Sequence, residues 1–286
     1  MVEPAVLDGT ASGQTAVIQT IDVLPLIAAF VVGCLVASFL NVVIWRVPNG
    51  ISLVDPPRSF CPTCKARIAW YDNIPLVSYA VLGGRCRHCH EPISARYPLV
   101  EALGGASAAM VVAGAMGGLY PGWLLPDLLY LAAVSIVVAF IDLDYQLILN
   151  VVVYPSYLVS LVLLSLASGM AGSWWSLGRA AAGGFALGVF YLLLALIWPG
   201  GMGMGDVKLA ALLGMSLAWM GWGPLLVGGF VAFLVGGVVG VVQMACHKVD
   251  IHGGIPFGPS MVVGAWIGIM AGAPLARLYL GLMGLG

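Results

Sequence analysis

Long apolar stretches dominate the pattern of hydrophobic and polar positions along this chain. The first, residues 23–44, is long enough to cross a hydrocarbon core about 30 Å thick, which takes about 20 helical residues. The same length test places further spans at residues 99–119, 123–141, 148–170, 177–198, 207–220, 224–245 and 259–282. Because the stretch 207–220 is short for a crossing, the pattern predicts an all-α polytopic membrane protein with about eight transmembrane helices, and seven as the competing number.

Two polar segments interrupt this pattern and suggest the domain organisation. We expect a polar N-terminal tail over residues 1–22, a first transmembrane helix over 23–45, an insert over 46–97 and a transmembrane core over 98–286. The tail contains Glu3 and Asp8 but no basic residue before its apolar neighbour, so it does not match a cleaved secretory signal.

The charge distribution predicts which side of the membrane the insert occupies. Residues 46–97 contain seven of the chain's 11 Lys and Arg residues, and the positive-inside rule places such a segment in the cytoplasm. Counting spans from there brings Asp142, Asp144, Asp206 and Lys208 to the same cytoplasmic face.

Composition supports a membrane protein and argues against nucleic-acid partners. Hydrophobic residues make up 61% of the chain and charged residues 8%, against about 25% charged residues in an ordinary soluble domain. The formal net charge is −1, so the chain lacks the basic surface that DNA or RNA binding requires. The lipid bilayer is therefore an expected partner and nucleic acid is not, while the oligomeric state is left open.

Four of the six cysteines form two Cys-x-x-Cys pairs inside the polar insert. Cys61 and Cys64 are separated from Cys86 and Cys89 by 21 residues, close to the spacing of zinc ribbons. An insert this small buries too little apolar surface to fold alone, whereas Zn²⁺ on four thiolates adds folding free energy directly. We expect a zinc-ribbon-like insert with structural zinc, and disulfides or a redox-active dithiol are the alternatives.

Three carboxylates at the ends of predicted spans are candidates for catalysis. Ionisable residues in such positions are costly and rare, which singles out Asp142, Asp144 and Asp206. Asp142 and Asp144 point about 200° apart on a helix, so at most one of them faces a partner across the bundle. A pair drawn from this set would share a proton and hydrolyse a peptide bond without a metal.

Other roles for these carboxylates remain open on the same residues. Asp142 and Asp206 are also suited to capping helices, to pairing with Lys208, or to forming a proton or cation pathway.

An ordered set of motifs carries a resemblance to a known family. The chain contains GCLVASFLNVVIWRVP at 33–48, NIPLVSY at 73–79 between the cysteine pairs, RYPLVE at 96–101, IDLD at 141–144, GMGDVK at 203–208 and IPFGP at 255–259. This set resembles the type IV prepilin peptidases, which are bifunctional leader peptidases and N-methyltransferases of type IV pilus and type II secretion systems. They fall within the GxGD class of aspartyl proteases.

The resemblance implies roles for particular residues and partners. Asp142 and Asp206 match the family's two catalytic aspartates, with Asp144, Gly203, Gly205 and Lys208 in support. The family's cysteine pairs match Cys61, Cys64, Cys86 and Cys89. The implied substrates are prepilins or pseudopilins whose basic leader is cleaved at the cytoplasmic membrane face, and S-adenosylmethionine is the implied methyl donor. No residue is assigned to that donor. Asn150 stands where family members often have an acid.

Overall fold

The computed structural model describes residues 23–55, 60–61, 63–197, 202–246 and 256–284. The predicted polar tail, residues 1–22, lies outside the described residues. The long helices are α1 (Val23–Arg46), α3 (Arg96–Met116), α4 (Leu125–Tyr145), α5 (Asn150–Ala171), α6 (Trp174–Ile197), α7 (Met204–Met220), α8 (Trp222–Ala245) and α9 (Gly258–Leu282). A short 3₁₀ helix, η2 (Gly122–Leu124), precedes α4.

The helical, membrane-spanning architecture expected from the sequence is confirmed. Within the described residues, seven helices are long and apolar enough to cross a membrane: α1, α3, α4 extended by η2, α5, α6, α8 and α9. The remaining long helix, α7, has 17 residues and corresponds to the stretch 207–220 that the sequence pattern marked as short. The chain is therefore a multi-pass membrane protein with seven candidate spans.

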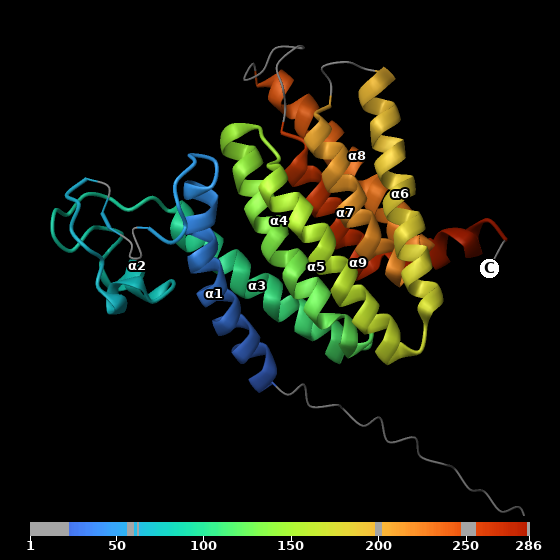
Figure 1. Ribbon diagram of the computed structural model, residues 1–286, viewed down its shortest axis with the longest axis horizontal. Coiled ribbons are helices and arrows are strands. Elements are labelled where there is room, and N and C mark those ends of the chain that lie inside the picture. Colours follow the sequence, from blue (N-terminus) through green and yellow to red (C-terminus); the bar gives the residue numbers. More distant parts are fainter. Residues whose placement is uncertain (1–22, 56–59, 62, 198–201, 247–255, 285–286) are drawn as a thin grey trace, which may run out of the picture.

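Helix α7 lies in the interior of the bundle. It contacts α4, α5, α6, α8 and α9, and most of its residues are buried, including Leu209, Leu212 and Leu217. In Figure 1 it lies among the helices of the C-terminal part of the chain. A helix that neighbours surround on all sides does not need the length of one that faces lipid across the full hydrocarbon core.

Small residues allow the closest helix pairs to approach. A Cβ atom on Gly33 of α1 would lie 2.4 Å from the carbonyl oxygen of Gly104 on α3. One on Gly183 of α6 would lie 2.1 Å from the Cβ atom of Ala218 on α7. Because lipid tails are as apolar as the helices, such close van der Waals packing is a main source of association between membrane helices.

The polar insert connects α1 to α3 and lies to one side of the bundle (Figure 1). Its described elements are a 3₁₀ helix, η1 (Trp70–Asn73), the short helix α2 (Val77–Val81) and two isolated β-bridges, Phe60–Arg67 and Arg85–Pro92. The end of α4 and the starts of α5 and α7 lie at the same end of the bundle as the end of α1.

The close α8–α9 packing predicts which glycines tolerate a side chain. A Cβ atom on Gly264 of α9 would lie 2.5 Å from the backbone nitrogen of Ala232, whereas one on Gly281 of the same helix meets no atom within 4 Å. Gly264→Val should therefore lower the free energy of unfolding by about 1–3 kcal/mol or more through overpacking. Thermal unfolding of the purified protein in detergent measures this, with Gly281→Val as control. Equal melting temperatures for the two variants would contradict the packing.

Candidate active site and metal centre

Asp142 lies in the last turn of α4, and its carboxylate is held by a backbone amide. The residue is 5% exposed, and the backbone N–H of Gly258, at the start of α9, donates a hydrogen bond of 2.9 Å to its Oδ2 atom. A Cβ atom on Gly258 would lie 2.7 Å from the same Oδ2. Glycine is therefore required at position 258, because a side chain there would displace the carboxylate.

Asp206 lies in the first turn of α7, and its carboxylate is held in a similar way. The residue is 9% exposed, and the backbone N–H of Gly203 donates a hydrogen bond of 2.9 Å to its Oδ2 atom. The Gly205 backbone packs against Ile148. A Cβ atom on Gly205 would lie 2.7 Å from the Cβ atom of Ile148. Asp206 thus caps the N-terminus of α7, which was one of the alternative roles expected for it. Gly203 supplies the amide for this cap, and Gly205 allows close packing against Ile148.

The two aspartates are 64 positions apart in the sequence, and the fold brings them close enough for their charges to interact. The negative charge of Asp142 acts on Asp206, and the charge of Asp206 acts in turn on the buried side chain of Tyr191 on α6. The Tyr191 ring lies 6.3 Å from the ring of Phe257, which directly precedes the Gly258 amide that holds Asp142. Helices α4, α6, α7 and α9 therefore meet around a pair of buried carboxylates.

The remaining predicted site residues lie beside this pair with partners of their own. Asp144 forms an ion pair with Arg96 at the start of α3, and the Arg96 guanidinium lies 5.3 Å from the centre of the Phe140 ring. Asp144 is thus engaged by the helix that follows the insert. The i, i+2 spacing had predicted that Asp142 and Asp144 face different partners.

Lys208 does not pair with either catalytic candidate within the described residues. Its Nζ atom donates a hydrogen bond of 2.8 Å to Oδ1 of Asn150 and lies 5.2 Å from the centre of the Tyr154 ring. The ion pair of Lys208 with Asp142 or Asp206, one of the alternatives, is therefore not formed in this structure. Asn150, which stands where an acid is usual in the resembling family, supplies a neutral acceptor instead.

Sequence reasoning did not single out several residues of this region. Gly258 belongs to the IPFGP motif at 255–259, but the sequence did not show that its backbone amide binds Asp142, and the ring of Tyr191 has no distinctive sequence pattern. Asp127 is a different case, because it lies within a predicted span and the rule on intramembrane carboxylates applies to it. It is buried near the start of α4, where Ser216 Oγ of α7 donates to its Oδ2 atom over 2.8 Å.

The four predicted cysteine ligands converge in the insert. The Sγ atoms of Cys61, Cys64, Cys86 and Cys89 all lie within 4.8 Å of one another, and those of Cys61 and Cys89 are 3.8 Å apart. Tetrahedral Zn²⁺ with Zn–S bonds of about 2.3 Å requires sulfurs about 3.8 Å apart. The cluster therefore fits a four-thiolate metal site.

The two Cys-x-x-Cys pairs form turns with the same backbone geometry. The Cys61 and Cys86 amides donate to the carbonyl oxygens of Ala66 and Glu91, each 2.9 Å away. The residues that follow Cys64 and Cys89 have left-handed backbones, with φ of 59° and 56°. Each turn is closed by one of the two β-bridges. The backbone N–H of Cys64 lowers the pKa of the Cys61 thiol to about 6, which favours the thiolate that binds metal.

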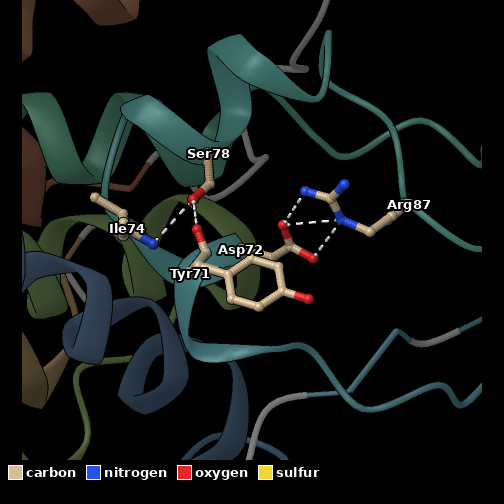
Figure 2. A network of polar contacts seen from close by, with 5 residues as sticks. All are labelled: Tyr71, Asp72, Ile74, Ser78 and Arg87. Atoms are coloured by element: carbon tan, nitrogen blue, oxygen red, sulfur yellow. Dashed lines mark hydrogen bonds and ion pairs between the residues drawn. The ribbon is translucent and has the colours of Figure 1, made fainter.

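An ion pair fastens the second cysteine turn to the middle of the insert (Figure 2). Arg87 donates from Nε and Nη2 to both carboxylate oxygens of Asp72, over 2.6–3.1 Å. These hydrogen bonds hold the pKa of Asp72 below its usual value. Beside this pair, Ser78 Oγ donates to the Tyr71 carbonyl and accepts from the Ile74 amide. The chain between the cysteine pairs thus has a fixed conformation.

A buried pair of carboxylates in a multi-pass membrane protein is the arrangement of an intramembrane aspartyl peptidase, and comparisons with known proteins agree with it. Residues 31–115 match the model of the bacterial peptidase A24 N-terminal domain, and residues 129–241 match that of the type IV leader peptidase family. The chain belongs to the type IV leader peptidase family, so it is an enzyme of the peptidase class. The resemblance found in the motifs is confirmed.

Individual relatives cover nearly the whole chain. A prepilin leader peptidase/N-methyltransferase from Aeromonas hydrophila is 36% identical over 281 residues, covering 88% of this chain and 92% of the relative. The protein of the same name from Pseudomonas aeruginosa is 34% identical, covering 89% and 93%. No solved structure matches the chain.

Proposed function

We propose that this protein is a membrane aspartic endopeptidase that cleaves the basic leader of type IV prepilin-like proteins at the cytoplasmic membrane face. It then methylates the new N-terminal amine with S-adenosylmethionine. The observation that carries the proposal is the convergence of Asp142 and Asp206, from two helices, into one buried and electrostatically coupled pair. The family and the names of the relatives support the same activities.

The proposed chemistry follows from the proximity of two like charges. Such a pair holds one proton between its two members, so one carboxylate is a base and the other an acid. The base takes a proton from water, which attacks the scissile carbonyl carbon, while the acid protonates the carbonyl oxygen. The resulting tetrahedral adduct collapses, the C–N bond breaks, and the amine leaves with a proton. The amides of Gly258 and Gly203 keep the carboxylates oriented throughout.

The position of the pair at one end of the bundle supports cleavage at a membrane interface. A peptide bond inside an intact helix is poorly accessible to water, so a scissile bond at the junction of a basic leader and an apolar helix is favoured. The insert begins where α1 ends, on this side of the bundle, and it is basic, so the positive-inside rule supports a cytoplasmic location. The substrates proposed are prepilins or pseudopilins of a pilus or a type II secretion system.

Zinc has a structural role in this proposal. The four thiolates of Cys61, Cys64, Cys86 and Cys89 would complete a tetrahedral shell, which leaves no position for substrate. The metal would therefore stabilise the insert and take no part in peptide hydrolysis, which the aspartates perform.

The aspartate pair predicts the outcome of three single substitutions. Asp142→Asn and Asp206→Asn should each lower cleavage of a synthetic prepilin-like substrate by at least 10³-fold, because each removes half of the proton-sharing pair. Asp144→Asn should retain cleavage within about tenfold, because it changes a carboxylate on the same helix that pairs with Arg96 instead. Mass spectrometry of the product N-terminus measures cleavage in membranes.

Two outcomes would overturn this assignment. An inactive Asp144→Asn enzyme beside an active Asp142→Asn enzyme would move the first catalytic role to position 144. Absence of cleavage by the wild-type protein would return attention to a carboxylate relay for ions or protons. Equal thermal melting temperatures of the variants exclude unfolding as the cause of a loss.

The cysteine cluster predicts the metal content of the purified protein. We expect about one zinc ion per wild-type chain by elemental analysis, and loss of most of it in Cys61→Ser. Limited proteolysis should then cut residues 46–97 faster, because the insert loses its metal-derived stability. Cys246→Ser is the matched control, since that thiol is exposed and lies outside the cluster. Equal zinc in both variants would contradict the site.

A further inference from the structure

The hydroxyl of Tyr191 on α6 is buried in the bundle and has no hydrogen-bond partner among the described residues. The residue is only 1% exposed. Three other tyrosines that are buried or half-buried in the bundle, Tyr120, Tyr130 and Tyr157, each form a hydrogen bond through the hydroxyl, over 2.5–2.9 Å. Because a buried tyrosine hydroxyl normally has a partner, the unpaired hydroxyl of Tyr191 requires an explanation.

Aromatic packing fixes the direction in which this hydroxyl points. The Tyr191 ring lies 5.1 Å from the ring of Phe233 on α8 and 6.3 Å from that of Phe257, and those two rings lie 5.5 Å apart. Phe257 in turn packs against α8 where Gly236 has no side chain, since a Cβ atom there would lie 2.2 Å from the Phe257 ring. A ring packed against two others holds its hydroxyl in one place.

That place is beside the aspartate pair. The charge of Asp206 acts on Tyr191, so the phenol lies within electrostatic reach of this carboxylate. On its other side the Tyr191 ring contacts Phe257, which directly precedes the Gly258 amide that binds Asp142. Within the described chain, however, the hydroxyl forms no hydrogen bond with either aspartate. The donor is therefore held near the pair without being used by it.

The two carboxylates also keep one oxygen atom each for another partner. The Gly258 and Gly203 amides both donate to Oδ2 atoms, of Asp142 and Asp206 respectively. The two Oδ1 atoms accept no hydrogen bond from the residues that the structure describes. Two acceptors and one donor thus have no partner at the site, which is what a water molecule and a peptide carbonyl group would use.

We propose that Tyr191 is a third catalytic residue, whose hydroxyl donates a hydrogen bond to the oxygen of the scissile carbonyl group. The inference rests on the proposed function, since it adds a donor to the peptide hydrolysis performed by Asp142 and Asp206. Negative charge develops on the carbonyl oxygen when water attacks the carbon, and a donor already held in place stabilises that charge without reorganisation.

The hydroxyl stabilises the adduct but transfers no proton. One carboxylate takes a proton from water as the oxygen–carbon bond forms, and the other gives its proton to the carbonyl oxygen. That oxygen has two lone pairs, so it can accept the hydrogen bond from Tyr191 at the same time. Because the hydrogen bond strengthens as the oxygen gains charge, it should raise the rate of cleavage more than the affinity for the substrate.

Replacement of Tyr191 by Phe tests the role of the hydroxyl, because it keeps the packed ring. In full-length protein in lipid nanodiscs, Tyr191→Phe should lower the single-turnover rate of cleavage of a synthetic prepilin-like substrate by about 10²-fold. Its affinity for a peptide in which –CH₂–CH₂– replaces the scissile amide should stay within twofold of wild type, because this peptide has no carbonyl oxygen for the hydroxyl to bind.

Tyr120→Phe is the matched control. It also removes a hydroxyl from a buried tyrosine, which is 5% exposed and donates to the Val111 carbonyl over 2.7 Å, but it lies near the start of α4, whereas Asp142 lies near its end. We expect this variant to cleave within threefold of wild type, even where its melting temperature falls.

The dependence of the cleavage rate on pH separates two roles for the hydroxyl. A donor to the carbonyl oxygen affects the height of the profile, so Tyr191→Phe should lower the plateau and leave the acidic limb in place. A donor to Asp206 would stabilise its charged form, and its loss would move the acidic limb to higher pH. Such a move would overturn the proposed contact with the carbonyl oxygen.

Two further outcomes would also overturn the inference. One is cleavage by Tyr191→Phe within threefold of the wild-type rate. The other is a slow variant that binds the –CH₂–CH₂– peptide equally weakly or melts well below Tyr120→Phe, which would show that position 191 serves packing. A wild-type protein that cleaves no substrate would instead refute the proposed function, and the inference with it.

Discussion

A buried carboxylate needs hydrogen-bond donors from the protein, because its burial restricts its contact with water. Asp142 and Asp206 obtain them from the backbone amides of Gly258 and Gly203, and much of the local architecture follows from this requirement. The start of α9 must approach α4 so closely that only glycine fits at position 258. At the start of α7, the Asp206 side chain must turn back toward the N-terminus of the helix to accept from the amide of the N-cap residue Gly203. The helix arrangement that satisfies each charge also brings the two charges together.

The short helix α7 makes this arrangement possible. It contacts five other long helices. Glycines at its contact with α6 allow the two helices to pack closely, which holds α7 in position along the bundle. At its far end, Ser216 donates to the buried carboxylate of Asp127, which ties α7 to the start of α4. Helices α4 and α7 are therefore joined near one end by Asp127 and meet near the other at the aspartate pair. A fixed spacing between two reacting groups is what acid–base catalysis requires.

Sequence patterns predicted the helices well because apolar length is a direct consequence of membrane thickness. They also singled out Asp142 and Asp206, which the structure shows to be buried, and the four cysteines, which it shows to converge, since charges in spans and paired thiols are rare. The contacts that depend on tertiary packing could not be predicted this way. The Gly258 amide, the ring of Tyr191 and the Arg96–Asp144 pair join residues with no shared local pattern. The Cys-x-x-Cys repeat was visible in the sequence, but the matching backbone hydrogen bonds and left-handed residues of the two turns were not.

The membrane core and the insert are stabilised by different forces, which makes them energetically separable. Close packing of small residues holds the core, while the Asp72–Arg87 pair and the proposed zinc ion on four thiolates hold the insert. Between them, the Arg96–Asp144 side chains are about one-third exposed, and ion pairs of this kind contribute about 0–1 kcal/mol. Loss of the insert's order would therefore leave the Asp142–Asp206 geometry largely intact.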